Sequence, residues 1–278
     1  MDRYCVLGNP VEHSRSPWIH ARFAQLTGQQ LEYGRRLAPL DGFVQTVQAF
    51  RAEGGKGCNV TLPFKFEAAA LATELTPRAQ LAQACNTLRF DSDRVLADNT
   101  DGIGLVNDIL HHAGVRIAGR DVLVVGAGGG AAGILGPLIE AGARRIVVCN
   151  RTLEKAQALV GRHAAVASAH GVALSACGLD AAEGAFDIVI NASASSLAGA
   201  QVPVPGSALK PGALAYDMMY GPAAQGFMQW AREHGAVARD GLGMLVEQAA
   251  EAFLLWRGVR PPSAPVLAEL RAIVDAKQ

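Results

Sequence analysis

The stretch DVLVVGAGGGAAGILGPLIEAG, which begins at Asp121, constrains the fold more than any other part of the chain. An apolar run typical of a buried strand leads into the glycine-rich segment Gly126–Gly130, and an Ala-rich helical pattern follows. In the pattern G-x-G-x-x-G/A, Gly126 permits the tight turn, Gly128 permits close approach of a pyrophosphate, and Ala131 permits close packing of helix on strand. The strand before and the helix after favour a dinucleotide site over a glycine-rich turn without a ligand.

The next apolar strand ends in VVCNRT, at Asn150, Arg151 and Thr152. Sites for NAD place an Asp or Glu roughly 20 residues past the glycines, where it binds the ribose hydroxyls. A guanidinium at this position instead attracts a 2′-phosphate, and Lys155 adds charge one helical turn further on. These residues indicate NADP rather than NAD; the alternative is that Arg151 is a solvated residue at a helix start.

Strand and helix patterns alternate along the rest of the chain. After RDVLVVG, strand patterns recur at RRIVVCN, GVALSA, FDIVINA and GALAYDMM, with helical segments between the first of them. This predicts a doubly wound parallel sheet. The first hundred residues carry strand patterns at RYCVL, LEYGRRL and GCNVT, with helices predicted at Pro17–Leu26, over GFVQTVQAFRA and from Pro63, so a second, mostly parallel sheet is expected there.

Helical patterns connect and close these regions. We predict a linking helix over Asp101–Ala113, an amphipathic helix over GLGMLVEQAAEAFLLWRG that Pro261 and Pro262 end, and a last helix over PVLAELRAIV. The fold class is therefore α/β, with two α/β domains.

Composition excludes several classes of protein. Lys plus Arg and Asp plus Glu number 25 each, so the chain has no electrostatic footprint for nucleic acid or an anionic membrane, and an acidic ligand must be recognised locally. No stretch approaches a membrane helix, no signal peptide is recognisable, and the five scattered cysteines predict reduced thiols in the cytoplasm. His111-His112 has no further ligand at metal-site spacing, so no metal is expected.

Several short polar motifs lie within the first hundred residues. GNPVEHSRSP presents Ser14 and Ser16, which either cap the helix that Pro17 starts or bind an anion. NVTLPFK places Lys65 in a first helical turn, where the helix dipole disfavours a cation, so the position suits a proton donor and acceptor unless the side chain is merely solvated. In DNTDG, Thr100 or Asp101 could cap a helix, and Asn86 in ACNT could be a turn residue.

Together these stretches resemble the shikimate dehydrogenase family over essentially the whole chain. The signatures GNPVEHSRSPWIH, NVTLPFK, ACNT, DNTDGIG, GAGGGAA, NRT, YDMMYGP and GLGMLVEQA appear in the family's order, and eight ordered signatures are far more specific than one glycine loop. The resemblance implies reversible NADPH-dependent reduction of 3-dehydroshikimate to shikimate in aromatic amino-acid biosynthesis. It also implies a substrate domain at 1–101 plus 242–278, a Rossmann-type NADP domain at 102–241 and a cleft between them.

The resemblance assigns roles residue by residue. Lys65 and Asp101 match the catalytic pair, which we treat as one coupled titrating unit. Lys65 and Asp101 also count among the substrate-binding positions. The others are Ser14 and Ser16 for the carboxylate, with Thr61, Asn86, Tyr220 and Gln248 for the ring hydroxyls or carboxylate. Positions matching cofactor contacts are Gly126, Ala127, Gly128, Gly129 and Gly130 for the phosphates, Asn150, Arg151, Thr152 and Lys155 for the 2′-phosphate, and Met218 and Gly241 for the nicotinamide.

Three alternatives remain. One is a quinate/shikimate dehydrogenase with relaxed substrate or cofactor choice. Another is a dehydrogenase for a different small acid, and the third is a non-catalytic sensor of shikimate or NADP on the same scaffold, for which the loss of Lys65 or Asp101 would be expected. The expected partner is a small molecule, with no nucleic acid and no membrane, and the protein is expected to be a monomer or homodimer.

Overall fold

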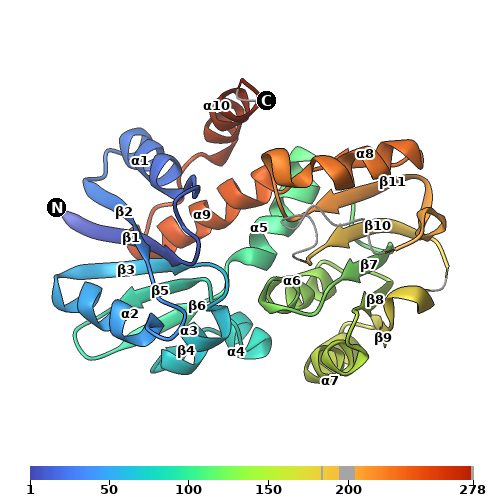
Figure 1. Cartoon of the computed structure of the whole chain (residues 1–278), viewed down its shortest axis with the longest axis horizontal. Helices are drawn as coiled ribbons and strands as arrows, with labels where there is room; N and C mark the ends of the chain where they lie inside the picture. The colour runs from blue at the N-terminus through green and yellow to red at the C-terminus, as the bar shows by residue number, and fades with distance from the viewer. Residues whose placement is uncertain (183, 194–203, 277–278) are drawn as a thin grey trace. The chain divides into compact units, whose positions relative to one another are not determined.

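The computed structural model describes residues 1–182, 184–193 and 204–276 (Figure 1). The chain forms two compact units. The first unit comprises Met1–Gly104 and Leu245–Leu270, and the second comprises Leu105–Met244 and Arg271–Gln278. The sequence led us to expect 1–101 with 242–278 and a middle domain of 102–241. The last residues group instead with the second unit, where Arg271 makes two hydrogen bonds to the Asp240 carboxylate, at 2.8 and 2.5 Å.

The first unit is built on a mixed six-stranded sheet of order β2-β1-β3-β5-β6-β4. Strands β1 (Asp2–Gly8), β2 (Leu31–Leu37) and β3 (Gly55–Val60) are parallel, as their helical connections require. Strand β5 (Thr87–Phe90) runs antiparallel to both neighbours, and β6 (Val95–Asp98) pairs with the short β4 (Glu74–Leu75). The alternating pattern predicted the parallel strands but not the β5–β6 hairpin.

Helices cover both faces of this sheet. They are α1 (Ser16–Thr27), α2 (Phe43–Ala52), α3 (Lys65–Leu71), α4 (Pro77–Ala82) and most of α9 (Leu242–Arg257). Part of α10 (Ser263–Asp275) belongs to the same unit, where Glu269 binds Arg22 of α1. One predicted boundary is wrong. Helix α3 begins at Lys65 rather than at Pro63, because a turn precedes it in which Phe64 N donates to Thr61 O. The predicted helix over GLGMLVEQAAEAFLLWRG is confirmed: α9 ends at Arg257, just before Gly258, which has a left-handed φ of 69°.

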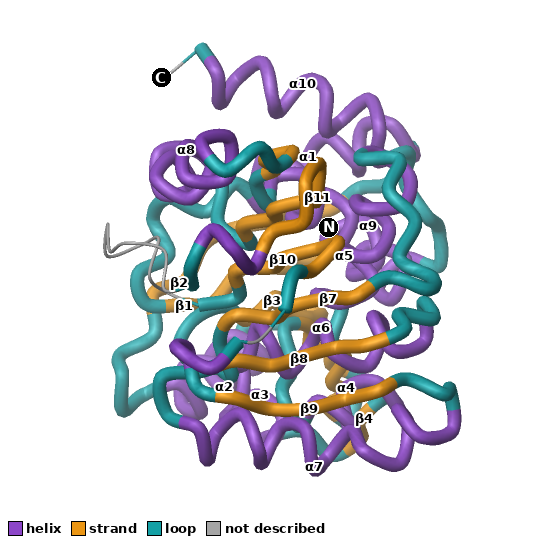
Figure 2. The backbone as a smooth tube through the Cα atoms, turned by 90° about the vertical axis from the view of Figure 1, so that its right-hand side faces the viewer, coloured by secondary structure: helices purple, strands orange, loops and turns teal. Residues whose placement is uncertain are grey.

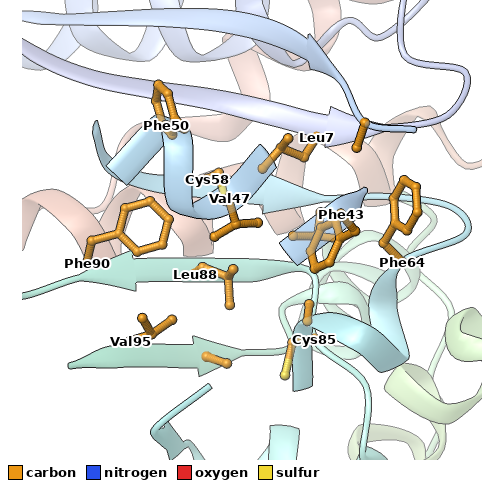
Figure 3. Close-up of a cluster of buried hydrophobic side chains, with 14 of the residues drawn as sticks. Leu7, Phe43, Val47, Phe50, Cys58, Phe64, Cys85, Leu88, Phe90 and Val95 are labelled. Atoms are coloured by element: carbon orange, nitrogen blue, oxygen red, sulfur yellow. The ribbon is translucent and has the colours of Figure 1, made fainter. Parts of the chain in front are cut away.

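Alternation along β1 divides the first unit's core into two layers. Cys5 and Leu7 point into a cluster with α2, α3 and β5, in which the rings of Phe43 and Phe64 stack 4.8 Å apart (Figure 3). Tyr4 points to the other face and stacks on Trp256 of α9, with ring centroids 4.6 Å apart. The long α9 is thereby packed on the sheet that carries the polar motifs.

The second unit contains a six-stranded, wholly parallel sheet of order β12-β11-β10-β7-β8-β9, whose neighbouring strands β10, β7, β8 and β9 are visible in Figure 2. The order reverses at β7 and β10, which is the doubly wound arrangement predicted from the sequence. The strands are β7 (Asp121–Val125), β8 (Arg145–Cys149), β9 (Ala173–Cys177), β10 (Phe186–Asn191), β11 (Leu209–Asp217) and β12 (Val237–Arg239).

Helices α6 (Gly129–Glu140), α7 (Leu153–Ala169) and α8 (Gln225–Glu233) connect these strands. Helix α5 (Asp101–Asn107) continues as a π-helical turn over Asp108–His112, so the linking helix predicted over Asp101–Ala113 is helical as far as His112. The sequence analysis did not predict α8 or β12. No helix among the residues described here is both long and apolar enough to span a membrane.

Candidate active site

The two serines of the first loop lie together at the start of α1. Ser14 Oγ lies 3.2 Å from Ser16 Oγ and accepts a hydrogen bond from Ser16 N at 3.3 Å. Helix α1 begins at Ser16, and the preceding residue, Arg15, makes no side-chain cap. The serine hydroxyls therefore converge on each other, as an anion site needs, and Ser16 is not the helix cap that the alternative interpretation required.

Lys65 and Asp101 form a close ion pair within the first unit. Lys65 Nζ lies 2.5 Å from Asp101 Oδ2, and the side chains are 14% and 2% exposed. Lys65 is the first residue of α3 and Asp101 is the first residue of α5. The Lys65 side chain is therefore less covered than the Asp101 side chain that binds its ammonium.

Asn86 joins this pair to the rest of the polar network. Its Nδ2 lies within hydrogen-bonding distance of Thr100 Oγ1 (3.0 Å), Asp101 Oδ1 (2.9 Å) and Gln248 Oε1 (3.0 Å), and its Oδ1 accepts from Thr100 N at 2.9 Å. Asn86 is therefore more than a turn residue. Its contact with Gln248 joins two residues that are 162 positions apart in the chain.

Asn99 takes the capping role that was expected of Thr100 or Asp101. Its Oδ1 accepts from Asp101 N at 3.1 Å, and its Nδ2 donates to Ala84 O at 2.7 Å. The Asp101 carboxylate is thereby left to bind Lys65 and Asn86.

The strand before this segment is anchored by a second ion pair. Burial opposes ionisation of Asp98, but hydrogen bonds from the Arg78 guanidinium at 2.7 and 2.6 Å hold the pKa of that carboxyl below its usual value. Arg78 also pairs with Glu251 of α9. Arg78 thus connects the last residue of β6, which precedes the segment that carries Asp101, to helix α9.

Two further residues extend the network toward the serines. Tyr33 Oη donates to Asn59 Oδ1 at 2.6 Å, and Asn59 Nδ2 donates to Asn86 O at 3.2 Å and Thr87 Oγ1 at 3.0 Å. Burial raises the pKa of Tyr33 well above its ordinary value, so the phenol remains a donor. Sequence reasoning gave Tyr33 no role, although its place on β2, beside the strand that ends at Gly8 just before the serine loop, was a usable signal.

The remaining predicted substrate contacts lie in different units. Thr61 follows β3, and its methyl group would lie 2.3 Å from a Cβ at Gly8, so the loop after β1 requires glycine there. Gln248 lies on α9 against Gly104 of the first unit. Tyr220 belongs to the second unit and precedes the 3₁₀ turn Gly221–Ala224.

The glycine loop of the second unit has the geometry of a phosphate cradle. Gly126 has a φ of 111°, and a Cβ there would lie 3.1 Å from the Ala192 backbone. Gly128 is exposed, with open space where a Cβ would stand, and α6 begins at the next residue without a side-chain cap. Ala131 is fully buried. The first backbone N–H groups of α6 are therefore left for a ligand.

Met218 lies against two glycines, Gly130 at the start of α6 and Gly241 after β12. A Cβ at Gly130 would lie 3.2 Å from Met218 Cε, and a Cβ at Gly241 would lie 2.3 Å from Met218 O. Met218 thus lies between the glycine loop and the turn that follows β12, which brings both predicted nicotinamide positions beside the predicted phosphate loop.

The predicted 2′-phosphate residues lie at the end of β8 and the start of α7. Asn150 Nδ2 donates to Thr152 O at 2.8 Å, and Thr152 precedes the first residue of α7. Arg151 and Lys155 are exposed, and neither forms an ion pair with any residue described in the structure. Both cations are available to an anion. Within the described part of the chain, no group of three or more His, Cys, Asp or Glu side chains could hold a metal ion.

Comparison with known families matches three successive parts of the chain. Residues 6–88 match the shikimate dehydrogenase substrate binding domain, residues 108–200 match shikimate / quinate 5-dehydrogenase, and residues 241–271 match the shikimate 5′-dehydrogenase C-terminal domain.

Individual relatives resemble the chain over nearly its whole length. Shikimate dehydrogenase (NADP(+)) of Acidovorax sp. (strain JS42) is 68% identical over 275 residues, covering 99% of this chain and 98% of that protein. An Ael1 enzyme from Pseudomonas putida has 46% identity and a TM-score of 0.87, covering 97% and 98% of the two chains. Shikimate 5-dehydrogenase from Thermus thermophilus, solved with NADP(H) and shikimate, has 30% identity and a TM-score of 0.85, covering 98% and 99%. The chain belongs to the shikimate dehydrogenase family.

Proposed function

We propose that this chain catalyses the reversible NADPH-dependent reduction of 3-dehydroshikimate to shikimate, a step of aromatic amino-acid biosynthesis. The observation that carries the proposal is the Lys65–Asp101 pair, in which the carboxylate of the buried Asp101 lies 2.5 Å from the ammonium of the less covered Lys65 side chain. Such a pair suits proton transfer to an oxygen that gains negative charge during reduction.

The first unit holds the substrate in this proposal. The Ser14 and Ser16 hydroxyls donate to the substrate carboxylate, because hydroxyl donors to an ionised acceptor form strong hydrogen bonds. The ring hydroxyls and the carboxylate are also contacted by the residues that the family resemblance assigns to them, namely Thr61, Asn86, Tyr220 and Gln248.

Lys65 moves the proton. In the direction of reduction its ammonium donates a proton to the carbonyl oxygen as that oxygen becomes a hydroxyl, and in the reverse direction the amine takes the proton back. Asp101 accepts a hydrogen bond from the ammonium and thereby directs it. Asn86, fixed by Thr100 and Gln248, keeps the Asp101 carboxylate in one orientation.

The second unit holds NADPH, which supplies the hydride when bound. Its residues fit this dinucleotide, because the Gly126–Gly130 segment (with Ala127 and Gly129) leaves backbone N–H groups open for the phosphates. Arg151 and Lys155 are the two cations that would bind the 2′-phosphate, and Asn150 and Thr152 lie beside them. Met218 and Gly241 lie beside the glycine loop, where they would contact the nicotinamide.

We further propose that the protein works in the cytoplasm as a monomer or homodimer on this small-molecule substrate, without nucleic acid or membrane as a partner. The zero formal net charge supports the absence of a polyanion site. All five cysteines carry free thiols, which fits a reducing compartment.

Four initial rates test the function. Shikimate and quinate are each assayed with NADP and NAD at the NADPH absorbance band. We expect shikimate with NADP to be fastest. The family description that names both shikimate and quinate makes quinate the relevant competitor. Equal rates with quinate would favour a relaxed quinate/shikimate dehydrogenase, and no turnover with tight shikimate binding would favour a sensor.

A further inference from the structure

Arg35 lies beside the serine pair, although sequence reasoning gave it no role. Its Nε and Nη2 donate to Ser14 O at 3.1 and 2.6 Å. Arg35 is on β2 two residues after Tyr33, so the two side chains share one face of the sheet, while Arg36 points to the other. The guanidinium therefore holds the backbone of the residue whose hydroxyl we assign to the substrate carboxylate.

The charge of Arg35 is not neutralised by the residues described in the structure. A backbone carbonyl satisfies hydrogen bonds but carries no net charge, and no described carboxylate lies within ion-pair distance of Arg35. Its neighbour Arg36 instead pairs with both oxygens of Glu53. Arg22 likewise binds Glu269 through two hydrogen bonds of 2.8 Å.

An unpaired guanidinium matters at this position because the serines themselves are neutral. A carboxylate that leaves water for two hydroxyls loses much of its hydration, and a cation close by compensates for that loss. The chain has no net charge, so the attraction must come from a nearby side chain. Arg35 also has further N–H groups beyond the two that bind Ser14 O.

We propose that Arg35 is a positioning residue of the carboxylate subsite, which fixes Ser14 and supplies the positive potential that selects an anionic substrate. The proposal rests on the proposed function, because it takes Ser14 and Ser16 as the carboxylate ligands. In this proposal Arg35 makes the enzyme prefer the ionised acid to neutral analogues of the substrate.

Arg15 is the competing source of positive charge. It lies between the two serines, is partly exposed, and its side chain has no ion-pair or hydrogen-bond partner among the described residues. Arg15 does not hold the serine backbone, however, whereas Arg35 makes two hydrogen bonds to it. The two arginines are therefore separable by substitution.

The test compares R35Q with R35K, R15Q and the matched control R36Q, using shikimate and its methyl ester at about 0.05 M and 0.5 M salt. We expect R35Q to raise KM for shikimate roughly tenfold with kcat within about threefold, and to remove the increase of KM with salt. KM for the ester should rise much less than KM for the acid, since the ester loses only the positioning of Ser14 and has no charge to recognise. R35K should recover part of the salt dependence, and R36Q should match the wild type.

Three results would overturn the proposal. R35Q could leave KM for shikimate unchanged, R35Q could weaken acid and ester equally, which marks a merely structural role, or R15Q could remove the salt dependence in its place. Calorimetric binding of shikimate is measured on the same proteins. A wild type that binds without turnover contradicts the proposed reaction while still testing Arg35, and a wild type that does not bind contradicts both.

Discussion

The two candidate sites are built in opposite ways. In the first unit the site consists of buried side chains that hold one another, with Asn86 bound to Thr100, Asp101 and Gln248. In the second unit it consists of open backbone at Gly128 and the exposed, unpaired cation of Arg151. A small ring with few polar groups requires preorganised partners, whereas a long dinucleotide gains affinity from many separate contacts.

The difference predicts its largest effect at Lys65. The variant Lys65→Met removes the proton donor, so kcat in both directions should fall by roughly 100-fold or more while KM changes little. Steady-state assays at the NADPH band measure it. Lys56→Met, at an exposed lysine on β3, is the control and should retain wild-type rates. Unchanged turnover in the Lys65 variant would remove this side chain from the chemistry.

The two asparagines of the two sites should differ in their contribution to stability. Asn86→Ala removes the hydrogen bonds that this amide makes with Thr100, Asp101 and Gln248, the first two of them buried, so the free energy of unfolding should fall by about 2 kcal/mol. Asn150→Ala removes a single bond to Thr152 O at an exposed turn and should cost less than about 0.5 kcal/mol. Urea unfolding of both variants measures these values. Equal losses would mean that the first site is no more tightly built than the second.

The exposed cation of the second unit should affect choice of cofactor rather than catalysis. Arg151→Ala should raise KM for NADP roughly tenfold, because a charged hydrogen-bonded contact to the 2′-phosphate is lost. NAD has no such phosphate, so its KM should stay within about twofold. Steady-state kinetics with both cofactors measure the ratio. A loss of the same size for both would contradict the assignment of the 2′-phosphate to Arg151.

Acid should weaken the first unit slightly, through His20. Complete burial lowers the pKa of His20 to about 3, and its ring stacks on Tyr33 with centroids 4.2 Å apart. In the unfolded chain the His20 imidazole takes up a proton below about pH 6.5, whereas in the folded chain it stays neutral. The free energy of unfolding therefore decreases as the pH falls from that value. Between pH 7 and pH 5.5 the loss should be about 1 kcal/mol.

His20→Phe keeps an aromatic ring against Tyr33 and should remove that part of the acid sensitivity. Urea midpoints at the two pH values, followed by the fluorescence of Trp256, which lies 5.3 Å from the His20 ring, measure the change. His170→Gln, at an exposed histidine, should behave like the wild type. A His20→Phe variant as acid-sensitive as the wild type would assign the effect to other groups.

The same contrast explains how much of the molecule could be predicted from the sequence. The glycine loop is recognisable because its determinants are local, with Gly126 and Gly128 between a strand and a helix. The polar network is not local, since Asn86 meets Gln248 through the packing of α9 on the first sheet. Its members could be identified only through the family resemblance.

Other features could not be predicted from the sequence for related reasons. The β5–β6 hairpin has strands of only four residues, too short for a periodic pattern to stand out. Arg35 reaches Ser14 only because β1 and β2 pair in parallel register, and no motif records that contact.

The most direct test of this division is calorimetric titration of shikimate and NADP, each alone, into Asn86→Ala and Arg151→Ala. The structure predicts a double dissociation: Asn86→Ala should weaken shikimate at least tenfold with the Kd for NADP unchanged, and Arg151→Ala should do the reverse. If either variant weakened both ligands to the same extent, recognition would not be divided between the two units.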